Sequence, residues 1–459
     1  MTETRGLLRS SPASAPPRPR SSPLKAYDPV FLVVLNVAVV TYMWFRHDGL
    51  GRSTDLGEWL VSIGQLAGLY AALAVLLGLV LISRAPWLER RYGMDQMMRA
   101  HRLVGFTAFW LMIGHVTATT VGLAMATGIS LWAQIVDYVQ NYPYLVNALI
   151  GFGLLMTIVG VSVRSIRSAL SYETWWIIHL SAYAGAALTF GHQTAIGADF
   201  VLDRWAFAYW TLLYASVAVL IVGYRWIALV VKHFRHRLQI SEVITESPDV
   251  VTLVLGGKRL DRVRAQAGQF FLLRVLDRRR WWKAHPFSLS APPDGRSLRF
   301  TVKALGEDTA ALQTVAPGTR VAVEGPYGGF LDALPTERKV LFVAGGIGIT
   351  PFRGLIDDLD RPDEVVLLYR NQTPDDAVFR NQLDALSSEK GFALHMSYSR
   401  FGGGDGNPFA PAELVRLVPD VRQRDVFIIG SARLIAAARN GLRLAGVPSK
   451  QIHLESFTY

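Results

Sequence analysis

The chain has 459 residues, enough for two or three domains, and 51% of them are hydrophobic. It contains no cysteine, which excludes disulfides, cysteine-ligated iron–sulfur clusters, thiolate zinc sites and a cysteine nucleophile. The formal charge is +11. A basic balance can indicate nucleic acid, but in a membrane protein it more often reflects Lys and Arg on the cytoplasmic side, and no nucleic-acid partner is predicted here. Any redox chemistry must use a histidine-bound metal or an organic cofactor.

The first half of the chain is predicted to lie in a membrane. Residues 1–27 are rich in Pro, Ser and Arg, which predicts a disordered basic tail, either solvated or in contact with anionic lipid. A transmembrane domain over 28–235 follows, with six stretches long enough to span a bilayer, which needs about 20 apolar residues. These predicted spans are 28–45, 58–83, 101–125, 143–163, 174–195 and 206–231.

The loop charges predict the orientation of these spans. Sixteen Lys and Arg lie in the tail, in the loops 84–102 and 164–173, and in the exit 225–237. The three opposite loops carry only Arg46, Arg52 and Arg204. The positive-inside rule therefore places both ends of the bundle in the cytoplasm.

The pattern changes at about residue 236. Short alternating segments with turn signals over 236–337 predict an antiparallel β-barrel. Strands and helices alternate over 338–459, which predicts a parallel sheet covered by helices. The expected fold class is a multi-domain membrane protein: a six-helix transmembrane bundle, then an antiparallel β-barrel, then an α/β domain with a parallel sheet.

Four histidines lie in the predicted spans. His101 and His115 are fourteen residues apart in the third span, and His179 and His192 are thirteen apart in the fifth. A buried polar ring costs free energy unless something binds it, and an ionisable residue in a membrane span is a candidate functional group. Fourteen residues of helix rise about 21 Å, so the two spans place matched histidines at two depths. This pattern predicts two stacked haems, each with one axial histidine from each span.

A competing interpretation makes these residues hydrogen-bonded core histidines or proton-relay groups. The occurrence of four histidines at matched depths favours a role as metal ligands over this interpretation. Thirteen steps of 100° do not return to the same helix face, so the fifth span is expected either to distort, with Gly185 as the candidate bend, or to present its haems on different sides. His233 and His236 are predicted to be interfacial residues, and the role of His47 stays open.

Three segments of the second half resemble the ferredoxin–NADP reductase superfamily: KAHPFSLS (283–290), TVKALGEDTAAL (301–312) and VAGGIGITP (343–351). In that family the first segment lines the flavin and the second lies near the FAD diphosphate. The resemblance therefore implies FAD contacts at His285, Pro286, Phe287, Ser288, Ser290, Lys303, Gly306 and Thr309.

The third segment carries a glycine motif. Gly345, Gly346 and Gly348 follow a predicted strand and open a predicted helix. Glycine there lets the backbone approach a pyrophosphate, and the helix N-terminus favours its charge. Thr350 fits an N-cap and Pro351 fits the first helical turn. These five residues are predicted to bind the dinucleotide.

Two further matches concern the nucleotide and the flavin. Ser399 and Arg400 match the pair that recognises the 2′-phosphate of NADPH, which favours NADPH over NADH. The family often ends with Glu, any residue and an aromatic residue, so Glu455 and Phe457 are the predicted catalytic residues, with the ring stacked on the flavin. Tyr459 extends beyond this pattern, which leaves the identity of the stacking ring open.

Together these features resemble the NADPH oxidase and ferric reductase superfamily, over nearly the whole chain after residue 28. The resemblance implies electron transfer from cytosolic NADPH through FAD and two b-type haems to an acceptor on the outer side of the plasma membrane. NADPH delivers two electrons as a hydride, haem accepts one, and a flavin separates the pair. The N-terminus and the reductase module are expected in the cytoplasm.

Dioxygen, giving superoxide, is the predicted acceptor. The spacing of fourteen and thirteen is similar to that of NADPH oxidases, and six acidic residues against three arginines in the outer loops disfavour anionic ferric chelates. Ferric iron is the first alternative, and a partner protein or quinone is another. No regulatory partner is expected. Two further hypotheses stay open: a haem-binding transporter or sensor with a vestigial reductase, and a soluble-type reductase anchored by its spans.

Overall fold

A computed structural model describes residues 28–47, 49, 55–167, 169–197, 200–201, 203–278, 280–328, 338–359, 361–398 and 407–456. The chain divides into two compact units. One comprises Pro19–Ala85 and Asp95–Trp226 and is helical throughout its described part. The other comprises Met1–Arg18, Pro86–Met94 and Ile227–Tyr459 and contains the β-strands.

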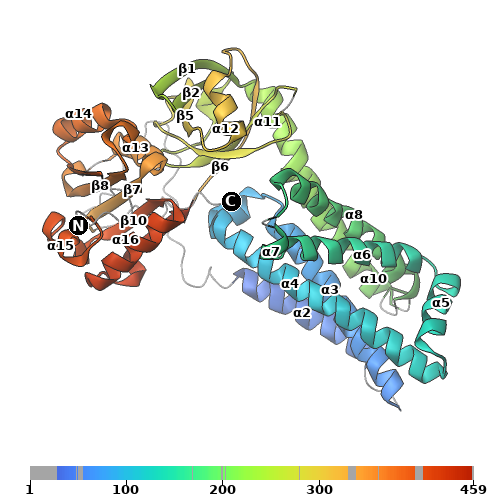
Figure 1. Ribbon diagram of the computed structural model, residues 1–459. Helices are drawn as coiled ribbons and strands as arrows, with labels where there is room; N and C mark the ends of the chain where they lie inside the picture. Colours follow the sequence, from blue (N-terminus) through green and yellow to red (C-terminus); the bar gives the residue numbers. More distant parts are fainter. Residues whose placement is uncertain are drawn as a thin grey trace, which may run out of the picture. The chain divides into compact units, whose positions relative to one another are not determined.

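The helical unit is a bundle of long helices. Figure 1 shows these helices roughly side by side, with the short helix α5 lying across one end of the bundle. α4 contains a break, because Gly93 has non-helical angles (φ 71°, ψ 150°). The helices up to residue 236 are α2 (Asp28–Arg46), α3 (Leu56–Leu81), α4 (Pro86–Thr127), α5 (Leu131–Asn141), α6 (Leu145–Ser162), α7 (Arg164–Arg167), α8 (Tyr172–Ile196), α10 (Arg204–Leu220), a π-helical turn η1 (Ile221–Ile227) and α11 (Ala228–His236). The first residues of α4, the last residue of η1 and all of α11 belong to the other unit.

Four helices are long and apolar enough to cross a membrane: Leu56–Leu81, Gln96–Thr127, Leu145–Ser162 and Arg204–His236. The prediction of six spans is confirmed for these four. Val30–Arg46 is apolar but shorter. α8 has 25 residues but is not among the four, because Glu173 and the two histidines lower its hydropathy. The predicted loop over 84–102 is wrong, since the helix α4 already begins at Pro86.

The bundle has a small core and a largely apolar exterior. Val40, Leu76 and Trp210 pack together in its interior, and Trp210 is fully buried. Outside, Leu103 is 69% exposed and Leu212 is 70% exposed, as expected for helices surrounded by lipid. Polar contacts connect the helices: the Tyr209 hydroxyl donates to Asn36 at 2.7 Å and the Tyr214 hydroxyl to Gln193 at 3.0 Å.

The strands after α11 first form two antiparallel three-stranded sheets, in the orders β1-β2-β5 and β4-β3-β6. Two isolated bridges join them, Gln239 with Arg320 and Leu289 with Phe300. The antiparallel prediction is confirmed, but two sheets with bridges take the place of a continuous barrel ladder. The elements are β1 (Gln239–Ser247), β2 (Val250–Gly256), β3 (Phe270–Val275), β4 (His285–Ser288), β5 (Ser297–Lys303), α12 (Glu307–Ala311) and β6 (Val321–Tyr327).

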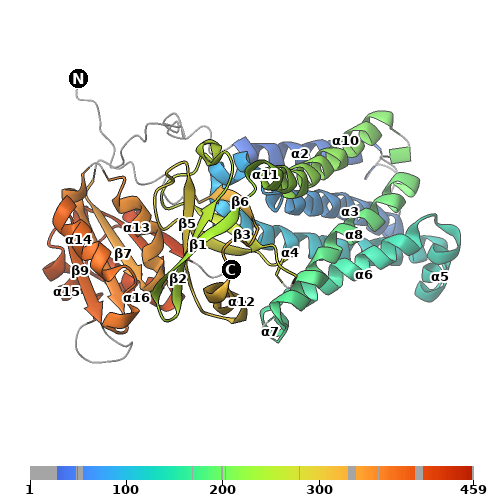
Figure 2. The same cartoon turned by 90° about the horizontal axis from the view of Figure 1, so that it is seen from above.

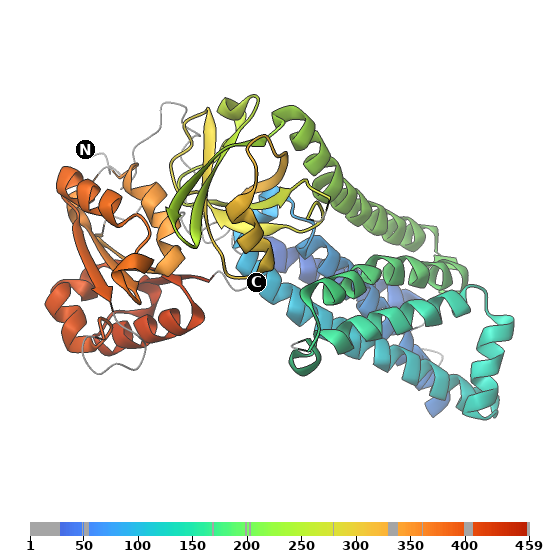
Figure 3. The same cartoon turned by 45° about the horizontal axis from the view of Figure 1, so that its top comes forward.

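The last part of the chain is a parallel five-stranded sheet in the order β11-β10-β7-β8-β9, which confirms the α/β prediction. Figures 2 and 3 show α13 and α14 on one face and α15 and α16 on the other, and each face carries its own buried apolar cluster. The elements are β7 (Val340–Gly345), α13 (Thr350–Ile356), β8 (Val365–Asn371), α14 (Arg380–Lys390), β9 (Ala393–Tyr398), α15 (Pro411–Leu417), β10 (Asp425–Gly430), α16 (Ala432–Leu444) and β11 (Ile452–Ser456).

One buried arginine connects three strands of this sheet at their amino ends. Arg424 directly precedes β10 and is 6% exposed. Its Nη1 donates to the carbonyl oxygens of Val340 at 3.0 Å and Glu364 at 2.8 Å, where β7 and β8 begin. Nε and Nη2 pair with the Asp420 carboxylate at 2.6 and 3.0 Å. The guanidinium thus cross-links the backbone of β7 and β8 to the residue that opens β10.

Arg424→Leu is expected to destabilise the sheet by about 3 kcal/mol, because it leaves a carboxylate and two carbonyl groups without their donor. The measurement is hydrogen exchange of the β7, β8 and β10 amides in the purified chain. Arg416→Leu is the control, since Arg416 forms an exposed pair with Glu413 and should leave exchange unchanged. Equal acceleration of exchange by both variants would contradict this account.

Candidate functional site

The four histidines of the helical unit form two pairs across α4 and α8. The ring centroids of His101 and His179 are 6.1 Å apart, and those of His115 and His192 are 6.4 Å apart. α8 is one continuous helix through Gly185 (Tyr172–Ile196), and both of its histidines face their partners on α4. Gly185 instead lies in close packing against α6, where an added Cβ would be 3.0 Å from Leu155.

A third helix orients the two histidines of α4. The Nδ1 atom of His115 lies 2.8 Å from the carbonyl oxygen of Gly64, and Nδ1 of His101 lies 3.1 Å from that of Gly78. Both glycines belong to α3 and are fourteen residues apart, as are the two histidines. A carbonyl oxygen only accepts, so Nδ1 carries the proton in both rings and Nε2 keeps a lone pair for a metal.

The geometry of each pair fits a haem iron. Two imidazoles on opposite sides of one iron, with metal–nitrogen bonds of about 2 Å, have ring centres about 6 Å apart. Within the described residues, no group of three or more His, Cys, Asp or Glu side chains could hold a metal. An ion between two of these imidazoles therefore needs further ligands from outside the protein, which the four nitrogens of a porphyrin would supply. The role of the four histidines as ligands stays a prediction.

Glycine makes room for one imidazole in particular. A Cβ added at Gly68 would lie 2.6 Å from Nδ1 of His115, closer than real Cβ contacts. A Cβ at Gly78 would lie 3.7 Å from Nδ1 of His101, which is an ordinary contact. The pair formed by His115 and His192 therefore depends more strongly on glycine, which has no side chain, at the facing position of α3.

The predicted flavin segment forms β4 and the turn after it. His285, Pro286 and Phe287 are half-buried, and β4 pairs with β3. Ser288 and Ser290 are each 5% exposed. Among the described residues, the buried Ser288 hydroxyl has no hydrogen-bond partner. A buried hydroxyl in this state fits a polar ligand such as a flavin, since unpaired buried donors cost free energy.

The residues predicted to lie at the FAD diphosphate already have partners. The Lys303 ammonium lies 3.2 Å from a carboxylate oxygen of Asp249 and 3.7 Å from one of Asp376. Lys303 therefore connects the antiparallel sheets to the parallel-sheet part of the same unit. The Thr309 hydroxyl accepts from the amides of Leu305 at 2.9 Å and Gly306 at 3.0 Å, so it closes the turn before α12.

An acidic residue beside this turn was missed by the sequence analysis. Asp308 pairs with the Lys283 ammonium at 2.9 Å and lies 3.7 Å from Nε2 of His285. It thereby ties the diphosphate segment to the flavin segment. The only sequence signal was the acidic pair in GEDT, close to a segment that carries a lysine and a histidine.

The three glycines of the nucleotide motif serve different purposes. Gly346 has φ +53°, and a Cβ there would meet nothing within 4 Å. A Cβ at Gly348 would lie 2.6 Å from the carbonyl oxygen of Ile429, so this glycine permits close packing on β10. A Cβ at Gly345 would collide with the Leu434 side chain. The hydroxyl of Tyr369, whose pKa is raised by burial, lies 3.2 Å from the Gly346 carbonyl oxygen and holds the motif in place.

The start of the following helix differs from the prediction. A 3₁₀ turn (Gly346–Ile349) precedes α13, and Ile349 occupies the N-cap position. Thr350 is the first helical residue, and its hydroxyl donates to the Ile347 carbonyl oxygen at 3.0 Å, so the N-cap prediction is wrong. Pro351 lies in the first turn as predicted.

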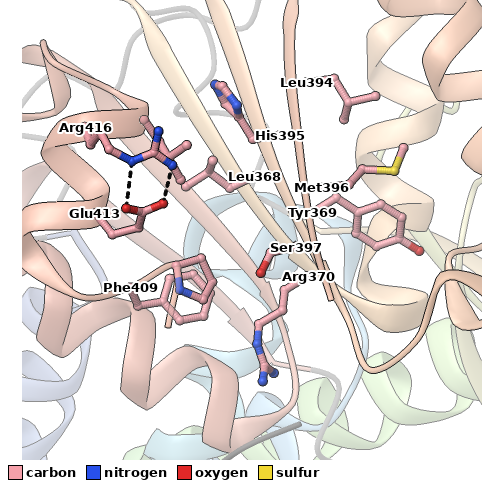
Figure 4. A pocket seen from close by; sticks show the side chains of 12 residues that line it. Leu368, Tyr369, Arg370, Leu394, His395, Met396, Ser397, Phe409, Glu413 and Arg416 are labelled. Atoms are coloured by element: carbon pink, nitrogen blue, oxygen red, sulfur yellow. Dashed lines mark hydrogen bonds and ion pairs between the residues drawn. The ribbon is translucent and has the colours of Figure 1, made fainter. Parts of the chain in front are cut away.

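A cavity of about 410 Å³ lies between the sheet and α15. Figure 4 shows alternate residues of β8 and β9 facing Phe409, Glu413 and Arg416, while Tyr369, Leu394 and Met396 point to the other face. Burial, and then the charge of Arg416, lower the pKa of His395, so this ring is neutral at pH 7. The side chains that face the cavity from the sheet are Leu368, Arg370, His395 and Ser397.

Other predicted residues lie elsewhere or outside the described part. Ser399, Arg400 and Phe457 lie outside the described residues. Glu455 lies in β11 and is in register with Ile429 of β10. The carboxyl ends of these parallel strands therefore bring Glu455 beside the backbone against which Gly348 packs.

Comparison with known proteins identifies the two halves. Residues 67–190 match the family described as "Ferric reductase like transmembrane component"; this range contains His101, His115 and His179, and His192 follows two residues after its end. Residues 236–330 match "FAD-binding domain". The chain has the domain architecture of the ferric reductase and NADPH oxidase superfamily. It combines a helical region similar to the ferric reductase family with a region similar to FAD-binding domains.

Several individual proteins are similar to part of the chain. The "3-ketosteroid-9-alpha-monooxygenase, ferredoxin reductase component" of Mycolicibacterium smegmatis is 32% identical over 48% of this chain and 65% of its own length. An "NADPH oxidoreductase" of Mycobacterium tuberculosis is 31% identical over 42% of this chain and 52% of its own. The chain thus covers less than two thirds of these relatives. A solved FAD/NAD-binding domain of a nitric oxide dioxygenase from Vibrio cholerae is 21% identical, with a TM-score of 0.41 over 48% of this chain and 98% of that domain.

Gly68→Ala is expected to displace the His115 ring and to abolish metal binding at that pair alone. The haem extracted per purified chain should fall from about two to about one, because the new methyl group lies within the contact distance of Nδ1. Gly78→Ala is the matched control at the other pair and should retain both haems. Full haem content in Gly68→Ala, or equal losses in the two variants, would refute the assignment.

Proposed function

We propose that this protein transfers electrons from NADPH, through FAD and two b-type haems, across a membrane to dioxygen, giving superoxide. The observation that carries the proposal is the two facing pairs of imidazoles on α4 and α8, with 6.1 and 6.4 Å between ring centroids; three of the four histidines lie in the region matched by the ferric reductase family. FAD held in this module would supply hydride acceptance with release of single electrons, and haems held by the histidine pairs would supply one-electron transfer across the membrane. All six predicted spans cross the plasma membrane in this proposal, with both ends in the cytoplasm.

The protein's own side chains hold and orient these groups. His101 with His179, and His115 with His192, would hold the two haems through their ring nitrogens, and the Gly78 and Gly64 carbonyls fix the orientation of the first ring of each pair. Two imidazole ligands per iron leave no open coordination position. Each haem site is therefore suited to storing and passing an electron rather than to binding a substrate.

The nucleotide enters at the carboxyl ends of the parallel strands. The cavity beside β9 supplies apolar surface from Leu368 and Phe409 for a base, and a guanidinium from Arg370 for a phosphate. Ser397, which faces this cavity, lies two residues before Ser399, the residue predicted to bind the 2′-phosphate. NADPH is the proposed donor, and the resemblance to a mycobacterial protein named NADPH oxidoreductase supports this choice.

The acceptor is dioxygen in this proposal because of the histidine spacing and the acidic outer loops. Ferric iron is the second candidate, favoured by the description of the matched family. Both acceptors use the same electron path. No activating partner is proposed.

The first measurement is anaerobic absorbance spectroscopy of the purified protein in detergent with FAD and NADPH. Reduced haem bands should appear and then bleach on admission of air, with formation of superoxide. Slow reoxidation in air but rapid reoxidation by a ferric chelate would make the protein a ferric reductase. Absence of haem bands would overturn the haem assignment, and absence of NADPH consumption would favour a transporter or sensor.

The variant His115→Leu tests the proposed path of electron transfer across the membrane. In proteoliposomes with NADPH on the reductase side, this variant should abolish reduction of an impermeant acceptor on the opposite side, because one haem is lost. His233→Leu is the control, since His233 belongs to neither pair and stacks edge-on against Phe234. Reduction that survives His115→Leu would favour a soluble-type reductase that is merely anchored in the membrane.

A further inference from the structure

Arg225 lies in the π-helical turn η1 (Ile221–Ile227), within the last candidate span. Its Nη1 donates to the carbonyl oxygen of Ile82 at 3.1 Å. Ile82 is the C-cap of α3 and follows Gly78, which orients His101, by one helical turn. The guanidinium is thus bound to the same end of α3 as the pair formed by His101 and His179. π-Helical turns occur frequently at functional sites.

The two histidine pairs differ in their electrostatic surroundings. Arg225 is held at the end of α3 that carries Gly78, whose carbonyl oxygen lies 3.1 Å from Nδ1 of His101. Gly64, whose carbonyl oxygen contacts His115, lies eighteen residues before Ile82 in the sequence, about 27 Å away along the helix axis. Since both pairs draw their imidazoles from the same two helices, Arg225 is a charge that distinguishes one site from the other.

The guanidinium has donors to spare for an anion. It carries five N–H groups in a planar fork, and within the described residues only the bond to Ile82 is formed. A cation in a membrane span generally pairs with an anion. A b-type haem carries two carboxylate side chains on its edge, and a carboxylate is the group that an arginine fork binds with two parallel hydrogen bonds.

We propose that Arg225 is a positioning residue for the haem between His101 and His179: it binds a haem carboxylate and raises the reduction potential of that haem alone. The proposal rests on the proposed function, because it requires a haem at this pair. Reduction of ferric iron adds one electron and removes one positive charge from the site. A fixed cation nearby therefore favours the reduced form.

The test is a potentiometric titration of the purified full-length protein in detergent, followed by the haem absorbance. His179→Leu, which removes one ligand of this pair, identifies which component belongs to it. In R225Q that component should shift to lower potential, so that at a fixed potential its ratio of reduced to oxidised haem falls about tenfold. The other component should stay in place. R225K keeps the charge but not the fork, so its shift should be smaller and in the same direction.

Arg204→Gln is the matched control, because Arg204 is the first residue of the continuous helical segment Arg204–His236 that also contains Arg225. It should leave the component of the His101–His179 pair unmoved. Loss of only that haem in R225Q would also support the proposal. Unchanged potentials in R225Q, equal shifts of both components, or loss of both haems in R225Q and R225K alike would overturn it. A shift that appears only after phospholipid is added would assign the guanidinium to a lipid headgroup instead and would also overturn it.

These outcomes are separate from a failure of the proposed function. If the unchanged protein shows no haem bands, the proposed function is wrong. If it shows two components and R225Q leaves both unaltered, only the role of Arg225 is wrong.

Discussion

The antiparallel register of α3 and α4 is the constraint on which the arrangement of the histidine pairs depends. Gly64 lies opposite His115 and Gly78 lies opposite His101, so the residue numbers of each pair have the same sum, 179. Both helices rise about 1.5 Å per residue, so a register that is correct at one level is correct again fourteen residues later. A single packing arrangement therefore orients two imidazoles about 21 Å apart.

That arrangement requires small residues and tolerates little change. Gly64, Gly68 and Gly78 line the face of α3 that meets α4, and a Cβ at Gly64 would lie 2.7 Å from Thr119. On the other side, α8 packs against α6 through Gly151, where a Cβ would lie 2.8 Å from the Gly185 carbonyl oxygen. Helices in lipid gain little from the hydrophobic effect between them, so close backbone approach is a main source of their association. The same close approach brings the imidazoles to a fixed separation.

The strand-containing unit is organised by charged side chains that reach backbone or cross between its parts. Arg424 joins the beginnings of three strands, and Lys303 joins Asp249 of one part to Asp376 of the other. Asp308 connects the two predicted flavin segments through Lys283. These contacts link residues far apart in the sequence. Each is recognised from an interatomic distance in the structure rather than from a sequence motif. Lys303, which was predicted to bind the FAD diphosphate, thus lies between two carboxylates of the protein itself.

The sequence alone was sufficient for the class of each region and for the identity of the paired histidines, because apolar length, strand alternation and histidine spacing are local properties of the chain. It predicted helices at all six apolar stretches, though α8 is too polar to count as a span by hydropathy, since it carries two of the four histidines. Contacts across the fold were decided only by the tertiary structure. The glycine carbonyls that fix the imidazoles, the position of Arg225 beside one pair, and the partners of Lys303 and Thr309 all depend on which helices and loops meet. So does the role of Gly185, which the sequence offered as a candidate bend and which the fold places in close packing against α6.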